Sequence, residues 1–125
     1  MTTLTKPGRL IAGAFLLSGA VHLARPQVFE PLIPPALPSP RSWVIGSGIA
    51  EIACGVGLLA RQPWAPRATA ATLLAVWPGN AWHAIRTQNS SQPPVVKAAL
   101  WARLPLQVPL IAAALRAYRE ESDSI

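Results

Sequence analysis

Four long apolar stretches, almost free of charge, dominate this sequence at residues 10–24, 43–60, 68–85 and 98–115. A helix that crosses the roughly 30 Å hydrocarbon core of a bilayer needs about 20 apolar residues, with about 17 as the lower end. The second, third and fourth stretches meet this length, and the first is short unless its flanks contribute. We therefore predict an all-α integral membrane bundle of four antiparallel transmembrane helices, over about residues 9–25, 42–60, 66–86 and 97–117, in a single domain that spans residues 1–125.

The composition argues against the other classes of chain. With 51% hydrophobic and 13% charged residues, a soluble monomer would lack the polar surface to cover itself. A signal peptide over residues 1–24 is disfavoured, because His22 and Leu23 fit the small-residue cleavage pattern poorly. The net charge of +6 does not predict a nucleic-acid partner, because the basic residues stand singly beside apolar stretches, where lipid headgroups lie.

The distribution of Lys and Arg predicts an orientation. With the N-terminus inside, six flanking basic residues face the cytoplasm and four face outward; the inner set is Lys6, Arg9, Arg61, Arg67, Arg116 and Arg119, and the outer set is Arg25, Arg41, Arg86 and Lys97. Cytoplasmic loops of membrane proteins carry the excess of positive charge. This bias predicts that both termini are cytoplasmic.

Each apolar stretch carries polar residues three or four positions apart, a spacing that places them on one helix face: Ser18 with His22, Ser47 with Glu51, Asn80 with His83, and Arg103 with Gln107. Ionisable groups in hydrocarbon are costly unless they face a partner or a water-filled cavity. In alternating antiparallel helices these positions converge in one leaflet. We predict a ligand site or buried polar network of His22, Glu51, Asn80, Arg103 and Gln107, with His83, Trp77, Trp82 and Trp101 as additional candidates.

Within this network the strongest predicted pair is Glu51 with Arg103. Each would remove the unpaired charge of the other, and Asn80, Gln107 and His22 would supply the remaining hydrogen bonds. A purely structural alternative stays open, in which the network only sets the register of the helices.

The segment between the first two stretches, residues 25–42, holds six prolines, which forbid a continuous helix. It is also too apolar for a solvated linker, so we expect an interfacial loop that covers the mouth of the polar cluster; a plain connector is the alternative.

The second stretch carries small residues at helical spacing, at Gly46, Ala50 and Cys54, and further glycines at Gly48, Gly55 and Gly57. Small residues let membrane helices approach closely. We therefore expect this helix to pack closely through these positions.

Several short runs resemble a known family. They are residues 18–22 followed by Pro26, Phe29, Pro34 and Leu37, then residues 47–51 with Gly55 and Gly57, then residues 78–80, then residues 103–107. In this order they are similar to the DoxX-like membrane proteins. The resemblance implies four helices in the bacterial cytoplasmic (inner) membrane, in a family that includes subunits of thiosulfate:quinone oxidoreductase and components of membrane-associated redox complexes.

Three classes of function remain open. In the first, the cluster binds a quinone or another lipophile with a polar head: His22 and Arg103 donate to a carbonyl oxygen, the candidate tryptophans contact the ring, and Glu51 exchanges a proton. In the second, the chain is a purely structural accessory subunit. In the third, it is a small proton-coupled exporter that uses Glu51. Haem held by His22 and His83 is a further alternative that we disfavour.

The sequence shows no metal-site spacing, no phosphate-binding glycine loop and no nucleophile-base pair. We therefore expect no catalytic residues, no metal and no independent enzyme activity. The expected partners are the lipid bilayer and either a redox protein or further copies of this chain.

Overall fold

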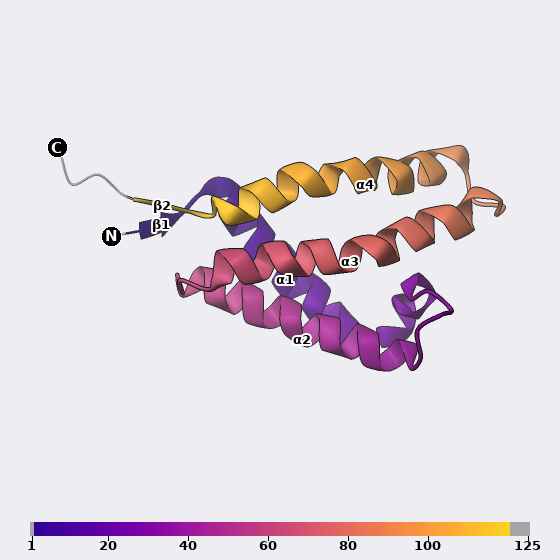
Figure 1. Cartoon of the computed structure of the whole chain (residues 1–125), viewed down its shortest axis with the longest axis horizontal. Coiled ribbons are helices and arrows are strands. Elements are labelled where there is room, and N and C mark those ends of the chain that lie inside the picture. The colour runs from indigo at the N-terminus through magenta and orange to yellow at the C-terminus, as the bar shows by residue number, and fades with distance from the viewer. Residues whose placement is uncertain (1, 121–125) are drawn as a thin grey trace.

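The computed structural model describes residues 2–120, and over these the chain is mostly helical, as predicted. Figure 1 shows four long helices along the long axis of the molecule: α1 (Lys6–Ala24), α2 (Pro40–Leu59), α3 (Ala65–Gln88) and α4 (Pro94–Leu115). Each has a proline at its first or second position. Proline suits the first turn because its ring presets the helical φ and no amide hydrogen is needed there. The helix ends lie within three residues of the predicted ones.

Among the described residues, three helices, α1, α2 and α4, are long and apolar enough to cross a membrane. The prediction was different for two helices. It judged the first stretch short for crossing a membrane unless its flanks contribute, and the third stretch long enough. Helix α1 gains length because it begins at Lys6. Helix α3 has the length but not the hydropathy, because Asn80, His83 and Arg86 lie within it.

The outer surface of the helices is apolar. Large hydrophobic side chains are exposed on all four, for example Leu10 on α1, Ile49 on α2, Leu74 on α3 and Val108 on α4. A helix that is apolar on its outward face as well as its inward face needs an apolar surrounding. The surface and the three candidate spans together indicate a membrane-associated protein.

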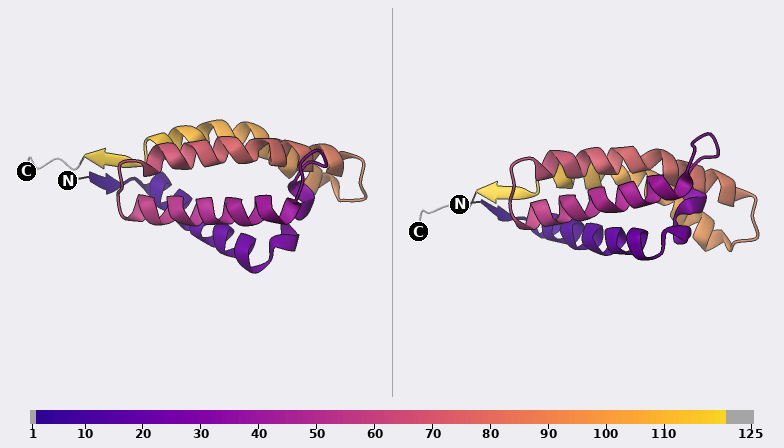
Figure 2. Two further views of the ribbon diagram at one scale, coloured as in Figure 1. Left: turned by 60° about the horizontal axis from the view of Figure 1, so that its bottom comes forward. Right: turned by 90° about the horizontal axis from the view of Figure 1, so that it is seen from below.

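The helices are arranged as two closely packed pairs, α1 with α2 and α3 with α4 (Figure 2). The apolar core lies in the half nearer the chain ends and consists of Ile11, Ala12, Phe15, Cys54, Leu58, Ala65, Ala70, Leu73, Ala114 and Ala117. The opposite half, toward the connection between α1 and α2, has none of these core residues. The two pairs are therefore held together mainly at one end.

Glycines set the close approach of α1 and α2. A Cβ atom at Gly19 would lie 2.8 Å from the Gly48 carbonyl oxygen, and one at Gly48 would lie 2.7 Å from the Cβ of His22. A Cβ at Gly55 would lie 3.1 Å from the Ala12 carbonyl oxygen. At Gly46 no atom outside the backbone of its own helix lies within 4 Å of such a Cβ, so Gly46 takes no part in the close approach of α1 and α2.

The chain ends form a small element that the sequence analysis did not predict. Strands β1 (Thr2–Leu4) and β2 (Tyr118–Glu120) pair antiparallel, with Thr3 opposite Arg119. Next to them, Thr5 caps α1 by accepting a hydrogen bond from the Gly8 amide at 3.0 Å. The start of α1 is thereby joined to the end of α4.

The proline-rich connection between α1 and α2 contains two single turns of 3-10 helix, Pro26–Val28 and Glu30–Leu32, followed by an irregular segment up to Ser39. As predicted, it forms no continuous helix. We call residues 25–39 the proline loop. Arg86 on α3 donates to the Pro31 carbonyl at 3.0 Å, which holds the proline loop against the second helix pair.

Tyr118 provides a test of the packing at the chain ends. Its hydroxyl donates to the Gln62 carbonyl at 2.7 Å and lies 3.3 Å from the Gly57 carbonyl. Desolvation raises the pKa of Tyr118, and nearby Arg61 lowers it by less. A pKa that is higher in the folded state stabilises the fold below the unfolded pKa, and this contribution is lost as pH rises through the folded pKa.

We expect Tyr118→Phe to lower the free energy of unfolding by about 1 kcal/mol at pH 7. The difference between the two proteins should narrow as the pH rises above about 10, the ordinary pKa of tyrosine. Thermal unfolding of both proteins in detergent between pH 7 and pH 11 measures this. A difference that stays constant over that range would contradict the prediction.

Candidate functional site

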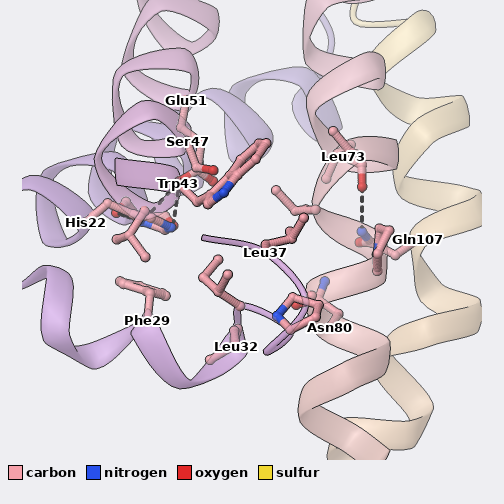
Figure 3. Close-up of a pocket in the computed structure, with 18 of the residues that line it drawn as sticks. His22, Phe29, Leu32, Leu37, Trp43, Ser47, Glu51, Leu73, Asn80 and Gln107 are labelled. Carbon is pink, nitrogen blue, oxygen red and sulfur yellow. Dashed lines mark hydrogen bonds and ion pairs between the residues drawn. The ribbon is translucent and has the colours of Figure 1, made fainter. Parts of the chain in front are cut away.

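A cavity of about 380 Å³ lies in the half of the molecule away from the core, between the two helix pairs. Helices α1 and α2 form one wall, α3 and α4 form the other, and the proline loop closes the remaining side (Figure 3). Most of the lining is apolar, and the loop contributes Phe29, Leu32, Ile33, Pro34 and Leu37. The proline loop therefore covers the predicted polar residues, as expected from its apolar composition.

The wall formed by α1 and α2 is centred on a carboxylate. Glu51 is only 8% exposed, and its Oε1 accepts a hydrogen bond from the Ser18 hydroxyl at 3.0 Å. The Nδ1 of His22 lies 3.2 Å from the same oxygen and 2.6 Å from the Ser18 carbonyl oxygen. A ring nitrogen between two acceptors acts as the donor, so Nδ1 carries the proton. The carboxylate thus has two partners from the neighbouring helix.

The proline loop is in direct contact with this group. The ring of Phe29 stacks on the ring of His22, with centroids 3.7 Å apart and an angle of 14° between the planes. The position of Phe29 in the loop was expected, but its partner was not. The stacking couples the position of the loop to the side chain that pairs with Glu51.

The wall formed by α3 and α4 is centred on a guanidinium group. Arg103 on α4 donates to the side-chain oxygen of Asn80 on α3. One turn further along α4, buried Gln107 donates to the Leu73 carbonyl at 3.0 Å. That carbonyl precedes the one at Leu74, whose helical donor is missing because residue 78 is proline. These polar contacts join α4 to α3.

The predicted ion pair between Glu51 and Arg103 is wrong. No ion pair within 4 Å joins these two residues, both of which the structure describes. Each finds its partner within its own helix pair, because the cavity separates the pairs at this level. Figure 3 shows His22 and Glu51 on one side of the cavity and Asn80 and Gln107 on the other.

All five residues of the predicted network line the cavity, at His22, Glu51, Asn80, Arg103 and Gln107. The additional candidates, all among the described residues, do not line it. Trp77 donates through its indole nitrogen to the Leu104 carbonyl at 3.1 Å, and Trp101 donates to the side chain of Gln88 at 2.7 Å. Trp82 and His83 also lie outside the cavity lining, and the Nδ1 of His83 is buried with no hydrogen-bond partner within residues 2–120.

Three further residues line the cavity but were not included in the predicted network: Ser18 and Ser47, which had been recognised on the same helix faces as His22 and Glu51, and Trp43. The helical spacing that selected His22 and Glu51 also places Ser18 and Ser47 on the same faces, and Trp43 precedes Ser47 by four positions. Extending the same rule by one turn would have added Trp43. The loop residues carry no comparable signal, because a loop has no regular period.

Together the fold and the cavity define a class of protein: a small, mostly helical, membrane-associated chain with a largely apolar cavity that has a carboxylate on one wall and a guanidinium on the other. The chain belongs to a family described as a domain of unknown function (DUF8561), whose model matches residues 11–118. It matches no curated protein and no solved structure.

This membership corrects the resemblance to the DoxX-like proteins, which is wrong. All the runs that suggested it lie between residues 18 and 107, inside the segment that matches the other family. Small residues and prolines recur in membrane helices because they serve helix packing and bending. Short runs of such residues therefore distinguish families poorly, and the redox role implied by the resemblance has no support.

Proposed function

We propose that this chain is a multi-pass membrane protein that binds a lipophilic molecule with a polar head in the cavity between its two helix pairs. The single observation that supports this best is the cavity, about 380 Å³ in volume, with an apolar lining and a few polar side chains that converge from both walls. Cavities of this kind, from about 300 to 1,000 Å³, are typical of small-molecule sites.

The proposal includes four antiparallel transmembrane helices in the bacterial cytoplasmic membrane, with both termini inside. Helix α3 has 24 residues, so it extends for about 36 Å at 1.5 Å per residue, enough to cross the hydrocarbon core. One of its polar residues, Asn80, accepts a hydrogen bond from Arg103 on α4. Polar groups are tolerated at membrane depth when they face a neighbouring helix or a cavity.

The proline loop supports the same proposal. Irregular backbone at membrane depth is tolerated where protein satisfies it, and here Arg86 bonds to the Pro31 carbonyl while Phe29 packs on His22. The loop presents Leu32, Ile33 and Leu37 to the cavity. These side chains supply an apolar wall for the ligand, and the polar groups of the helices supply hydrogen bonds to its head.

The two alternatives are less well supported. A proton-coupled exporter needs a carboxylate that is free to exchange its partner, whereas Glu51 is already bonded to Ser18 and close to His22. A purely structural subunit needs no cavity, and a well-packed interior would serve it better. A quinone fits the proposed ligand class, with Phe29 and Trp43 as the aromatic side chains that would meet its ring.

A cavity-filling substitution tests the proposal. Ser47→Leu places a larger apolar side chain in the cavity, whereas Gly46→Leu adds the same side chain one residue away, where no described atom lies within 4 Å of the new Cβ. We expect a lipophile to co-purify with the wild-type protein in mild detergent. Ser47→Leu should reduce its amount by about tenfold, equivalent to about 1.4 kcal/mol of affinity, and Gly46→Leu should leave it unchanged.

Mass spectrometry of organic extracts from the three purified proteins provides the measurement. The proposal fails if no lipophile is enriched over the surrounding membrane lipid, or if Ser47→Leu retains as much as the wild type.

A further inference from the structure

We propose that the head of the bound molecule is an anion, a carboxylate or a phosphate ester, and that Arg103 binds it. This inference rests on the proposed function and adds the chemical class of the ligand. Its basis is the unequal state of the two charged walls of the cavity.

The acidic wall is already satisfied. The carboxylate of Glu51 accepts from the Ser18 hydroxyl at 3.0 Å and lies 3.2 Å from the Nδ1 of His22. Both partners belong to the adjacent helix α1, which is held close to α2 at Gly19 and Gly48. A cationic or donor head on the ligand would have to compete with these two groups for the carboxylate.

The basic wall is not satisfied. Arg103 lines the cavity and is partly buried, and its hydrogen-bond partner within residues 2–120 is the neutral amide oxygen of Asn80. A guanidinium has five N–H donors, and within the described residues only the bond to Asn80 uses one of them. No carboxylate of the described chain lies within 4 Å of Arg103. A charge at membrane depth is costly unless it is paired. A negative charge on the ligand would therefore stabilise the guanidinium of Arg103.

The chemistry of arginine narrows the class of head. The planar guanidinium matches carboxylate and phosphate oxygens with two parallel hydrogen bonds, and these charge-assisted bonds are stronger than bonds to a neutral carbonyl. Asn80 accepts from Arg103 and so orients the guanidinium, and its own amide N–H groups, which have no partner within residues 2–120, can donate to the same anion. Arg103 and Asn80 together therefore form a recognition site for an anionic head.

The apolar lining defines the rest of the ligand. Leu32, Ile33 and Leu37 from the proline loop and Val76 from α3 border the same cavity as Arg103. A volume of about 380 Å³ lies toward the small end of ligand sites. It suits an anionic head with the adjoining part of one acyl or alkyl chain better than it suits a whole two-chain phospholipid.

Equilibrium binding of four probes to the purified full chain in maltoside detergent tests the inference. The probes are radiolabelled dodecanoate, dodecyl phosphate, dodecanol and decylubiquinone. We expect at least one of the two anions to bind about tenfold more tightly than dodecanol and decylubiquinone, the gain expected for a charge-assisted bond. The tighter of the two anions identifies the head as carboxylate or phosphate.

Variants of Arg103 test whether this residue causes the preference for an anion. Arg103→Gln should weaken anion binding about tenfold, to the level of dodecanol, and Arg103→Lys should retain part of the preference. Arg116→Gln is the matched control, because Arg116 is an exposed residue that caps the same helix and does not line the cavity. It should leave the binding of all four probes unchanged.

The two proposals fail in different ways. If dodecanol and decylubiquinone bind as tightly as both anions, the anionic head is wrong and the lipophile site stands. If none of the four probes binds to the wild-type protein, the proposed function itself is wrong. Should Arg103→Gln not fold, as judged by circular dichroism, the wild-type comparison and Arg103→Lys decide the inference.

Discussion

Replacing His22 with phenylalanine is expected to lower the free energy of unfolding by about 3 kcal/mol, because it removes one partner of a buried charge. The phenyl ring can keep the stacking on Phe29, so the packing against the proline loop is largely retained. What is lost is the Nδ1 group 3.2 Å from the carboxylate of Glu51, a residue that is only 8% exposed. The carboxylate is then left with the Ser18 hydroxyl.

A double variant separates this cause from a general packing defect. Adding Glu51→Leu to His22→Phe removes the stranded charge, and replacing both members of a buried pair by apolar residues is often neutral. We expect the double variant to recover most of the loss. Equilibrium unfolding in mixed detergent micelles, followed by far-ultraviolet circular dichroism, measures all three proteins. A single variant as stable as the wild type would show that the pairing contributes nothing.

Replacing Gly19 with alanine is the second prediction with a large effect. The added Cβ would lie 2.6 Å from the Cγ1 of Ile52 and 2.8 Å from the Gly48 carbonyl oxygen. The backbone oxygen cannot move aside without displacing α2, so we expect a loss of about 2 kcal/mol, within the range for overpacked interiors.

Gly13→Ala on the same helix is the matched control, because no described atom lies within 4 Å of a Cβ there. It should be neutral or stabilising by up to about 1 kcal/mol, the difference in helix propensity. The same unfolding measurement compares the two. Equal stability of both variants would contradict the close contact of α1 with α2 at Gly19.

Most of the secondary structure could be read from local sequence. Apolar stretches of nearly constant length, with a proline in the first turn of each helix, define where the helices lie. The strand pair at the chain ends was missed, because Thr2–Leu4 and Tyr118–Glu120 are too short to show a period and pair only across the whole length of the chain. The membrane character of α1 and α3 was misjudged, because it depends on where each helix begins and on the polar residues it includes.

The candidate site was predicted in part. The rule that residues three or four positions apart share a helix face selected five residues that do line one cavity. The rule could not assign partners, since it says nothing about which helix packs closest to which. The prediction therefore paired Glu51 with Arg103. In the structure Glu51 lies beside His22, and Arg103 bonds to Asn80.

The amino-acid sequence alone determined that this chain is mostly helical and apolar on its surface, and that its few polar side chains lie on shared helix faces, because periodicity and hydropathy are local properties. The tertiary structure decided which of those faces meet. Glycine contacts bring α1 against α2, polar bonds join α3 to α4, and the core holds the two pairs together at one end. The cavity exists because the pairs do not close at the other end, and no pattern within a single helix specifies that.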